Sequence, residues 1–302
     1  MDTPEPHHIR PANQATWSPP MPEAAGFEHL VVETPGLRSH VAAMGEGDPV
    51  VLLHGFPQHW WQWREVAPVI AAEGHRVYCP DLRGAGWTVA DDPRVERETR
   101  LRDLLALYDA LGIERAHLLS HDMGAITAIQ LTYDHPERVR AAVQLSVPPF
   151  FMSFSPRSMP GFRHLPAFIW HEPGASLRGT FSEAYVAHPL PEETIDAHLA
   201  PMALPAIDGA VRPLTRGMIL REARRMAGGT YRRKRLTVPT LVVLGRKDRP
   251  WTEDLMARTC RKPERYADRL EFAYVDDAAH FITDDAPEAV ARLALDWFAR
   301  AA

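Results

Sequence analysis

The sequence predicts an α/β fold with a mostly parallel central sheet, helices on both faces and an inserted helical cap. Short apolar runs alternate with helix-like segments from residue 48 to residue 147, which is the pattern of βαβ units. The alternation stops at Pro148 and resumes near residue 238. A chain of 302 residues, 45% hydrophobic and 24% charged, can form one large domain with an insertion or two modest domains.

The chain divides into three parts by composition. Residues 1–25 are proline-rich, and we expect a flexible or loosely docked N-terminal arm that is neither a signal peptide nor an anchor. Residues 26–147 and 230–302 carry the alternating pattern of the core. Residues 148–229 are rich in Pro, Phe and Met without a clear strand, which predicts the helical cap.

The first elements are a hairpin and a buried strand. Residues 27–34 ("FEHLVVET") and 37–44 ("LRSHVAAM") flank Pro35-Gly36, a turn pair that predicts two antiparallel strands. Residues 49–55 ("PVVLLHG") form a continuous apolar run that ends at a glycine, as expected of a buried parallel strand.

Helices and strands then alternate. Residues 60–74 read as a helix closed by Gly74, and residues 75–81 ("HRVYCPD") as a strand. Residues 95–113 place leucines at helical spacing and predict an amphipathic helix. The series continues with a strand at 115–120 ("RAHLLS"), a helix at 123–136 and a strand at 139–147.

The last elements return to the sheet. Residues 212–229 form an amphipathic helical tail of the cap, and residues 238–245 ("VPTLVVLG") resume the strands. The pattern then predicts a helix over 251–260, a final strand over 270–275 and a closing helix over 286–302.

Composition argues against several classes of partner. A net charge of -5 gives no electrostatic case for nucleic acid or an anionic membrane. No apolar run approaches the roughly 18 residues of a spanning helix. The cysteines, Cys79 and Cys260, cannot build a disulfide framework, so we expect a reducing, cytoplasmic setting. We expect no metal and no cofactor, because His7-His8 and Asp276-Asp277 lack further ligands at recognisable spacing.

A carboxylate stands at a predicted strand-to-helix turn. In "LLSHDMGAITA", Asp122 has small residues two positions before and after it, Ser120 and Gly124, as a sharp nucleophile elbow requires. The helix that starts at Met123 directs its partial positive charge at this point, which favours an anion. Alternatively, Asp122 is only a helix N-cap, since Asp is a preferred residue there.

Three further strand ends support the catalytic interpretation. The loop "HGFP" (54–57) follows a strand and could supply the N–H of Phe56 to an oxyanion hole, together with the N–H of Met123. Asp248 and His280 each follow a late strand. The chain order Asp122, Asp248, His280 is that of nucleophile, acid and histidine in α/β-hydrolases.

The sequence resembles the epoxide hydrolase and dehalogenase branch of the α/β-hydrolase fold. The motifs that carry the resemblance are "HGFP" with its following tryptophans, "DLRGAGWT", "SHDMGA" and "AAHF". The resemblance implies that Asp122 attacks a saturated carbon and forms an alkyl ester. His280, oriented by Asp248, would then activate the water that hydrolyses the ester.

An epoxide also needs O–H donors for its ring oxygen, and the family usually takes two tyrosines from the cap. Tyr231, in "GGTYRRKR", resembles the second of them. The first has no tyrosine at its place, so His164 and His171 are candidates, and Tyr185 is a further candidate although its position is late. Trp60 and Trp170 are expected to bind substrate.

Epoxide hydrolysis is therefore the first expectation, with a small apolar epoxide and water as reactants. A dehalogenase that uses the same nucleophile on a haloalkane or haloacid is the alternative. A ligand-binding homologue without turnover is the third interpretation, although Asp122, Asp248 and His280 are all present. The enzyme could form a homodimer.

Overall fold

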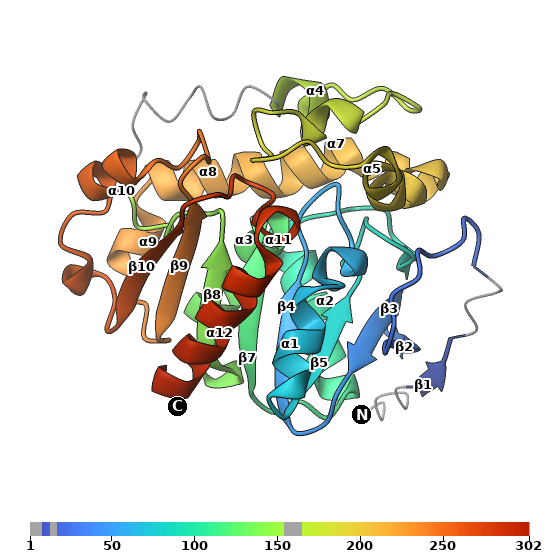
Figure 1. Ribbon diagram of the computed structural model, residues 1–302, viewed down its shortest axis with the longest axis horizontal. Coiled ribbons are helices and arrows are strands. Elements are labelled where there is room, and N and C mark those ends of the chain that lie inside the picture. Colours follow the sequence, from blue (N-terminus) through green and yellow to red (C-terminus); the bar gives the residue numbers. More distant parts are fainter. Residues whose placement is uncertain (1–7, 13–16, 154–164, 302) are drawn as a thin grey trace.

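The computed structural model describes residues 8–12, 17–153 and 165–301. Its centre is one ten-stranded sheet (Figure 1) in the order β1-β2-β3-β5-β4-β7-β8-β9-β10, with β6 paired to β3. The pairs from β5 to β10 are parallel, and those that involve β1, β2, β3 and β6 are antiparallel. The predicted mostly parallel α/β sheet is confirmed.

The strand bounds follow the apolar runs of the sequence. The strands are β1 His8–Pro11, β2 Glu28–Thr34, β3 Leu37–Met44, β4 Asp48–Leu53, β5 His75–Pro80, β6 Val89–Ala90, β7 Ala116–His121, β8 Val139–Leu145, β9 Thr240–Gly245 and β10 Leu270–Val275. All residues of β7 and β9 are buried, whereas β10 at the edge is only half-buried. A strand covered on both faces needs a continuous apolar run, which explains why alternation is weak in the centre.

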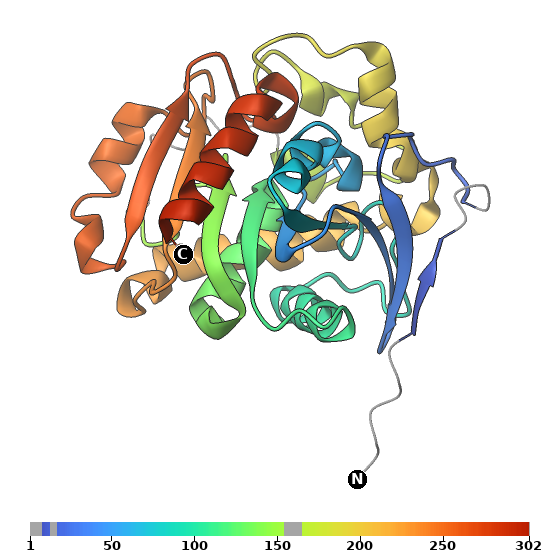
Figure 2. The ribbon, with the colours of Figure 1, turned by 60° about the horizontal axis from the view of Figure 1, so that its bottom comes forward.

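Helices cover both faces of this sheet (Figure 2). The helices α1 (Val66–Ala72) and α12 (Pro287–Ala301) pack on one face, and α2 (Arg97–Ala110) and α3 (Asp122–Asp134) on the other. Two separate hydrophobic clusters fill these layers. The helix expected over 60–74 is broken into a 3-10 turn, η2 (Trp60–Trp63), and α1.

Between β8 and β9 the described residues form helices and turns without a strand. This insert, residues 165–229, lies over the carboxyl ends of the parallel strands (Figure 1). Its helices are α4 Leu165–Ile169, η5 Arg178–Phe181, α5 Glu192–Leu199, η6 Ala200–Ala203, α6 Pro205–Asp208, α7 Val211–Leu214, the π-helical turn η7 Thr215–Ile219 and α8 Leu220–Ala227.

Shorter elements complete the core. They are η3 Pro136–Arg138, α9 Thr230–Arg233, η8 Pro263–Arg265 and α11 Ile282–Asp285, and α10 Glu253–Thr259 precedes η8.

Residues 8–12 and 17–25 of the expected N-terminal arm contact the core. Strand β1 pairs antiparallel with β2 at the edge of the sheet. Met21 is buried, and the indole N–H of Trp87 donates to the carbonyl of Pro19. Backbone pairing and indole donors supply contacts that proline content alone does not reveal. The rest of the expected arm, residues 1–7 and 13–16, lies outside the described residues.

Within the described residues, none of the helices is both long and apolar enough to cross a membrane.

Asp81, at the end of β5, ties the loops on this side of the sheet together. Its carboxylate accepts from the ring Nδ1 of His40 at 2.7 Å and from the backbone N–H groups of Trp60 at 2.9 Å and Trp87 at 3.0 Å. Burial alone would raise the pKa of Asp81, but the charge and hydrogen bond of His40 lower it to about 2. A buried carboxylate with several donors is stable only while those donors stay in place.

Gly86 permits this arrangement. It adopts φ +55°, and a Cβ built on it would lie 2.0 Å from Cγ of Asp81. Gly86→Ala should therefore lower the free energy of unfolding in urea by about 2–5 kcal/mol, because left-handed strain adds to a steric clash.

Gly74→Ala is the matched control, since Gly74 has φ +82° but nothing within 4 Å of the position that a Cβ would occupy. That variant should lose only the backbone part, about 1–2 kcal/mol. Equal losses in the two variants would contradict the role assigned to the contact with Asp81.

Candidate active site

The turn between β7 and α3 presents Asp122 above the sheet. Asp122 is one of three described non-glycine residues with positive φ, at 45°. Two residues later, a Cβ on Gly124 would lie 2.3 Å from the carbonyl oxygen of Leu53 in β4. The turn is thus pressed against the neighbouring strand, and only a residue without a side chain fits there.

The loop after β4 supplies a hydrogen-bond donor to this carboxylate. The backbone N–H of Phe56 donates to Asp122 Oδ1 at 3.0 Å. The loop is held in turn by Gln62, whose Oε1 accepts from the N–H of Gly55 at 2.8 Å. Met123 lies beside the same carboxylate, but no hydrogen bond from its N–H to Asp122 is found in the described part of the chain.

His280 lies between two carboxylates. Its Nε2 is 3.4 Å from Asp122 Oδ2, and its Nδ1 is 3.3 Å from Asp248 Oδ2. Asp248 follows β9, is fully buried, and leaves its Oδ1 without a hydrogen-bond partner among the described residues. The structure therefore brings together the three residues that the sequence places at separate strand ends.

The charges of this group depend on one another. Burial alone would lower the pKa of His280, but the charge of Asp248 and the hydrogen bond and charge of Asp122 raise it to about 10. Burial alone would raise the pKa of Asp122, yet His280, His121 and the N–H of Phe56 hold it below its ordinary value. Burial raises the pKa of Asp248 against the pull of His280. At neutral pH His280 is therefore an imidazolium beside the Asp122 carboxylate.

Two residues that the sequence-based reasoning missed hold the backbone of His280. Burial lowers the pKa of His121 to about 4, so its ring is neutral, and Nε2–H donates to the carbonyl of His280 at 2.8 Å. The hydroxyl of Ser146 donates to the same carbonyl at 2.7 Å. Ser146 directly follows β8 and has φ 58°. The strand-end rule applied to Asp248 would also have identified it.

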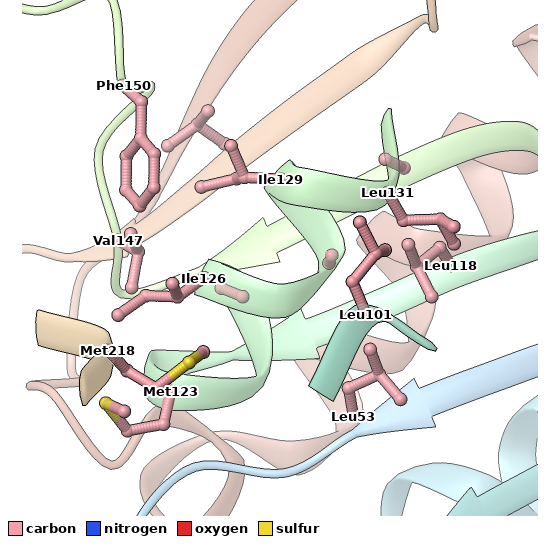
Figure 3. Packing of buried hydrophobic residues seen from close by; sticks show 14 of the residues in the cluster. Leu53, Leu101, Leu118, Met123, Ile126, Ile129, Leu131, Val147, Phe150 and Met218 are labelled. Atoms are coloured by element: carbon pink, nitrogen blue, oxygen red, sulfur yellow. The ribbon is translucent and has the colours of Figure 1, made fainter. Parts of the chain in front are cut away.

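Two adjoining cavities reach Asp122 and His280. The larger is lined by Asp122, Met123, Ile126, Ser146, Val147, Pro148, Phe150, Met152, Leu165, Ile219, Glu222, Ala223, Met226, Pro250, Trp251 and His280. The smaller is lined by Phe56, Asp122, Met123, Phe168, Thr180, Tyr185, Leu214, Thr215, Ile219, His280 and Phe281. Figure 3 shows Met123 and Ile126 of α3 next to Val147, with Phe150 above them. The walls come from both the core and the insert.

The structure corrects the expected ring-opening donors. Tyr231 does not line either cavity; it lies on α9, and its hydroxyl donates to Glu222 Oε2 behind the wall formed by α8. His171 is also away from both cavities, buried with its Nε2 2.6 Å from Asp208 Oδ1. His164 lies outside the described residues. Tyr185, which the sequence places late for this role, does line the smaller cavity.

The two tryptophans expected to bind substrate also lie outside both cavities. Trp60 is fully buried in the core, with edge contacts to Phe27 and His29, because its backbone N–H is bound by Asp81. Trp170 is 64% exposed. Trp251, just after β9, lines the larger cavity instead.

Among the residues that the structure describes, no group of three or more His, Cys, Asp or Glu residues could hold a metal ion.

The chain is similar in sequence and fold to several known proteins. A family model described as the alpha/beta hydrolase fold matches residues 48–188. Epoxide hydrolase 3 of Siraitia grosvenorii is 42% identical over 125 residues, 40% of this chain and 39% of that protein. Bifunctional epoxide hydrolase 2 of Sus scrofa is 32% identical over 183 residues, 55% of this chain and 32% of that protein. The matched segments span less than half the length of these curated relatives.

A solved structure matches over more of the chain. The epoxide hydrolase of Vigna radiata is 25% identical with a TM-score of 0.76, and the match covers 92% of this chain and 99% of that one.

The coupling between Asp122 and His280 predicts a measurable shift. Asp122→Asn removes one of the two negative charges that favour the imidazolium, so the pKa of His280 should fall from about 10. A fall of about one to three pH units is expected for one close charge. An NMR titration of labelled histidine, assigned with His280→Gln, measures it. Asp277→Asn, which removes an exposed partner of His188, should leave His280 unchanged. An equal pKa in Asp122→Asn and wild type would contradict the coupling.

Proposed function

We propose that the chain is an epoxide hydrolase-like α/β-hydrolase and that it converts an epoxide to a vicinal diol through an ester on Asp122. The observation that carries the proposal is the Asp122 carboxylate itself. One of its oxygens accepts from Phe56 N–H, and the other faces His280 at the base of an apolar cavity. A carboxylate in this position is already charged and needs no base to become a nucleophile.

In the first step, an Asp122 oxygen attacks one epoxide carbon from the side opposite the ring oxygen. The C–O bond to that carbon breaks, and its electron pair stays on the oxygen as an alkoxide. The alkoxide must take a proton from a nearby O–H group. Tyr185 is the candidate, because it lines the cavity that also contains Asp122 and His280. Its ring lies 6.0 Å from that of His280, centroid to centroid.

Ester formation changes the charge beside His280. The Asp122 ester is neutral, so His280 loses the partner that helped to hold its proton. Its pKa should fall, and the ring then releases its proton, which restores the hydroxyl of Tyr185. Neutral His280 can act as a base. Asp248 remains as the charged partner that orients the ring through Nδ1.

In the second step, neutral His280 accepts a proton from water, and the resulting hydroxide equivalent attacks the ester carbonyl. Asp122 Oδ1, which accepts from the N–H of Phe56, becomes the oxyanion. The N–H of Met123 is the second candidate donor. One such donor contributes about 3–4 kcal/mol. Collapse of the tetrahedral intermediate breaks the bond between the Asp122 carbon and the alkyl oxygen. That oxygen takes the proton of the new carboxyl group and leaves as the diol, which restores the carboxylate.

Dehalogenation uses the same nucleophile and remains the second candidate. The names of the relatives favour the epoxide, since those compared above are called epoxide hydrolases. A small apolar epoxide suits the Ile, Val, Phe and Met side chains of the larger cavity.

Isotopic labelling tests the ester directly. A single turnover in heavy-oxygen water should place the label in the Asp122 carboxylate, because water attacks the ester carbonyl while the diol leaves with the old carboxylate oxygen. Peptide mass spectrometry measures it. In His280→Gln, the same peptide should instead carry the mass of the substrate. Label that appears only in the diol would contradict attack by Asp122.

The donor assignment predicts a selective loss. Tyr185→Phe should slow the opening of an epoxide by about 10²- to 10⁴-fold, the usual contribution of a general acid. Displacement of bromide from a matched bromoalkane should change little, because bromide leaves without a proton. Rapid-quench measurement of ester formation compares the two. Tyr108→Phe is the control, since Tyr108 is a buried residue of α2 that lines neither cavity. Equal slowing of both substrates would remove Tyr185 from the donor role.

A further inference from the structure

Glu222 is an acidic residue in an otherwise mainly apolar wall. It lies on α8 and lines the larger cavity together with Asp122 and His280. The neighbouring lining residues of α8 and α3 include Met226, Met123 and Ile126. The proposed reaction takes no step at Glu222. A buried carboxylate costs free energy unless it is compensated, so its partners need to be identified.

Glu222 has partners on its far side. Its side chain is 2% exposed, and Arg97 Nε lies 2.9 Å from Oε1. Gln130 Nε2–H donates to Oε1 at 3.0 Å, and the Tyr231 hydroxyl donates to Oε2. These groups come from α2, α3 and α9, so Glu222 is held rigidly from the core.

Glu222 has acceptor capacity left at Oε2. A carboxylate offers about four lone-pair positions, and Oε1 already accepts from Gln130 and faces the Nε atoms of Arg97 and Arg225 at 2.9 and 3.8 Å. Among the described residues, Oε2 accepts one hydrogen bond, from Tyr231. A ligand group that donates a proton would satisfy this acceptor, whereas a further acceptor would be repelled.

The charge of the cluster favours a neutral donor. Arg97 also pairs with Asp134, and Asp134 pairs with Lys234 at 2.6 Å. Arg225 Nε lies 3.8 Å from Glu222 Oε1, and Arg225 also pairs with Glu98. The three carboxylates, Glu222, Asp134 and Glu98, are therefore matched by three cations. An ammonium group would add an unmatched buried charge, while a hydroxyl adds a donor at no such cost.

We propose that Glu222 binds a hydroxyl group of the substrate, remote from the carbon that Asp122 attacks. The substrate class is then an epoxide on an apolar body that carries a distant alcohol. The epoxide part of this inference rests on the proposed function, but recognition of the hydroxyl does not.

Matched ligands test the recognition without any reaction. One pair consists of an aryl cyclopropane with a distant hydroxyl and its analogue with methyl in place of the hydroxyl. Neither can be opened by Asp122. The wild-type protein should bind the alcohol about 10-fold or more tightly by calorimetry, as expected of a hydrogen bond to a charged acceptor. The corresponding epoxide pair should show the same preference in kcat/KM.

Glu222→Gln keeps the size of the side chain and removes its charge, so the preference for the alcohol should fall towards unity. Glu96→Gln is the matched control, because Glu96 forms an exposed ion pair with Arg221 outside the cavity. It should retain the full preference. If Glu222→Gln fails to fold, Glu222→Asp keeps the charge but shortens the side chain by one methylene, and the preference for the alcohol should fall in that variant.

Each outcome separates the two claims. Equal binding of both cyclopropanes to the wild-type protein would overturn the assignment of Glu222, and turnover of epoxides would still stand. A preference for the alcohol without turnover of either epoxide would support the hydroxyl site and refute the proposed function. A preference that persists in Glu222→Gln would also overturn the assignment.

Discussion

The close approach of the β7–α3 turn to β4 is the constraint on which the site depends. Gly124 lies against the carbonyl of Leu53, and this contact brings the Asp122 carboxylate to Phe56 N–H. The register of β4 with β7, which pairs Leu53 with Ser120, fixes the two strand ends at one height. β8, β9 and β10 continue the parallel series and contribute Ser146, Asp248 and His280 at the same edge. A one-residue slip in any of these ladders would reverse the facing of its side chains.

Burial gives this edge its chemical character. Two carboxylates and one imidazole share a site with little access to water, so each charge strongly affects the others. In the resting site the positive charge of His280 balances the negative charge of Asp122, and Asp248 is not part of this neutral pair. Alkylation of Asp122 would remove one negative charge and leave His280 to Asp248 alone. Asp122 can thus act as a nucleophile beside the His280 cation, and after alkylation His280 can act as a base beside the Asp248 anion. Neither change needs a side chain to move.

The sequence was sufficient for residues whose position follows from regular structure. Asp122, Asp248 and His280 each lie in a segment that follows a strand, and parallel strands bring their carboxyl ends together whatever the details of packing. It failed for Tyr231, His171, Trp60 and Trp170, whose side-chain directions depend on irregular backbone. Tyr231 lies two residues after Gly229, which has φ +70° and caps the short helix α9, and no periodic sequence pattern predicts such a turn. The hydrophobicity of Trp60 was equally compatible with a cavity wall and with the core. The hydrogen bond from the Trp60 N–H to Asp81 places Trp60 in the core, and the two residues are 21 positions apart in the sequence.

The insert and the core are joined by charges as well as by apolar packing. Glu222 of the insert meets Arg97 of α2 and Gln130 of α3, and Arg225 reaches Glu98 on the exposed side. Apolar packing tolerates sliding of one helix over another, whereas a buried ion pair loses most of its energy when one partner shifts. These contacts therefore fix the position of α8 relative to α3, the helix that begins at Asp122. The distance from the nucleophile to the far cavity wall is set by the same contacts, so the length of an acceptable substrate and the docking of the insert are governed by one set of residues.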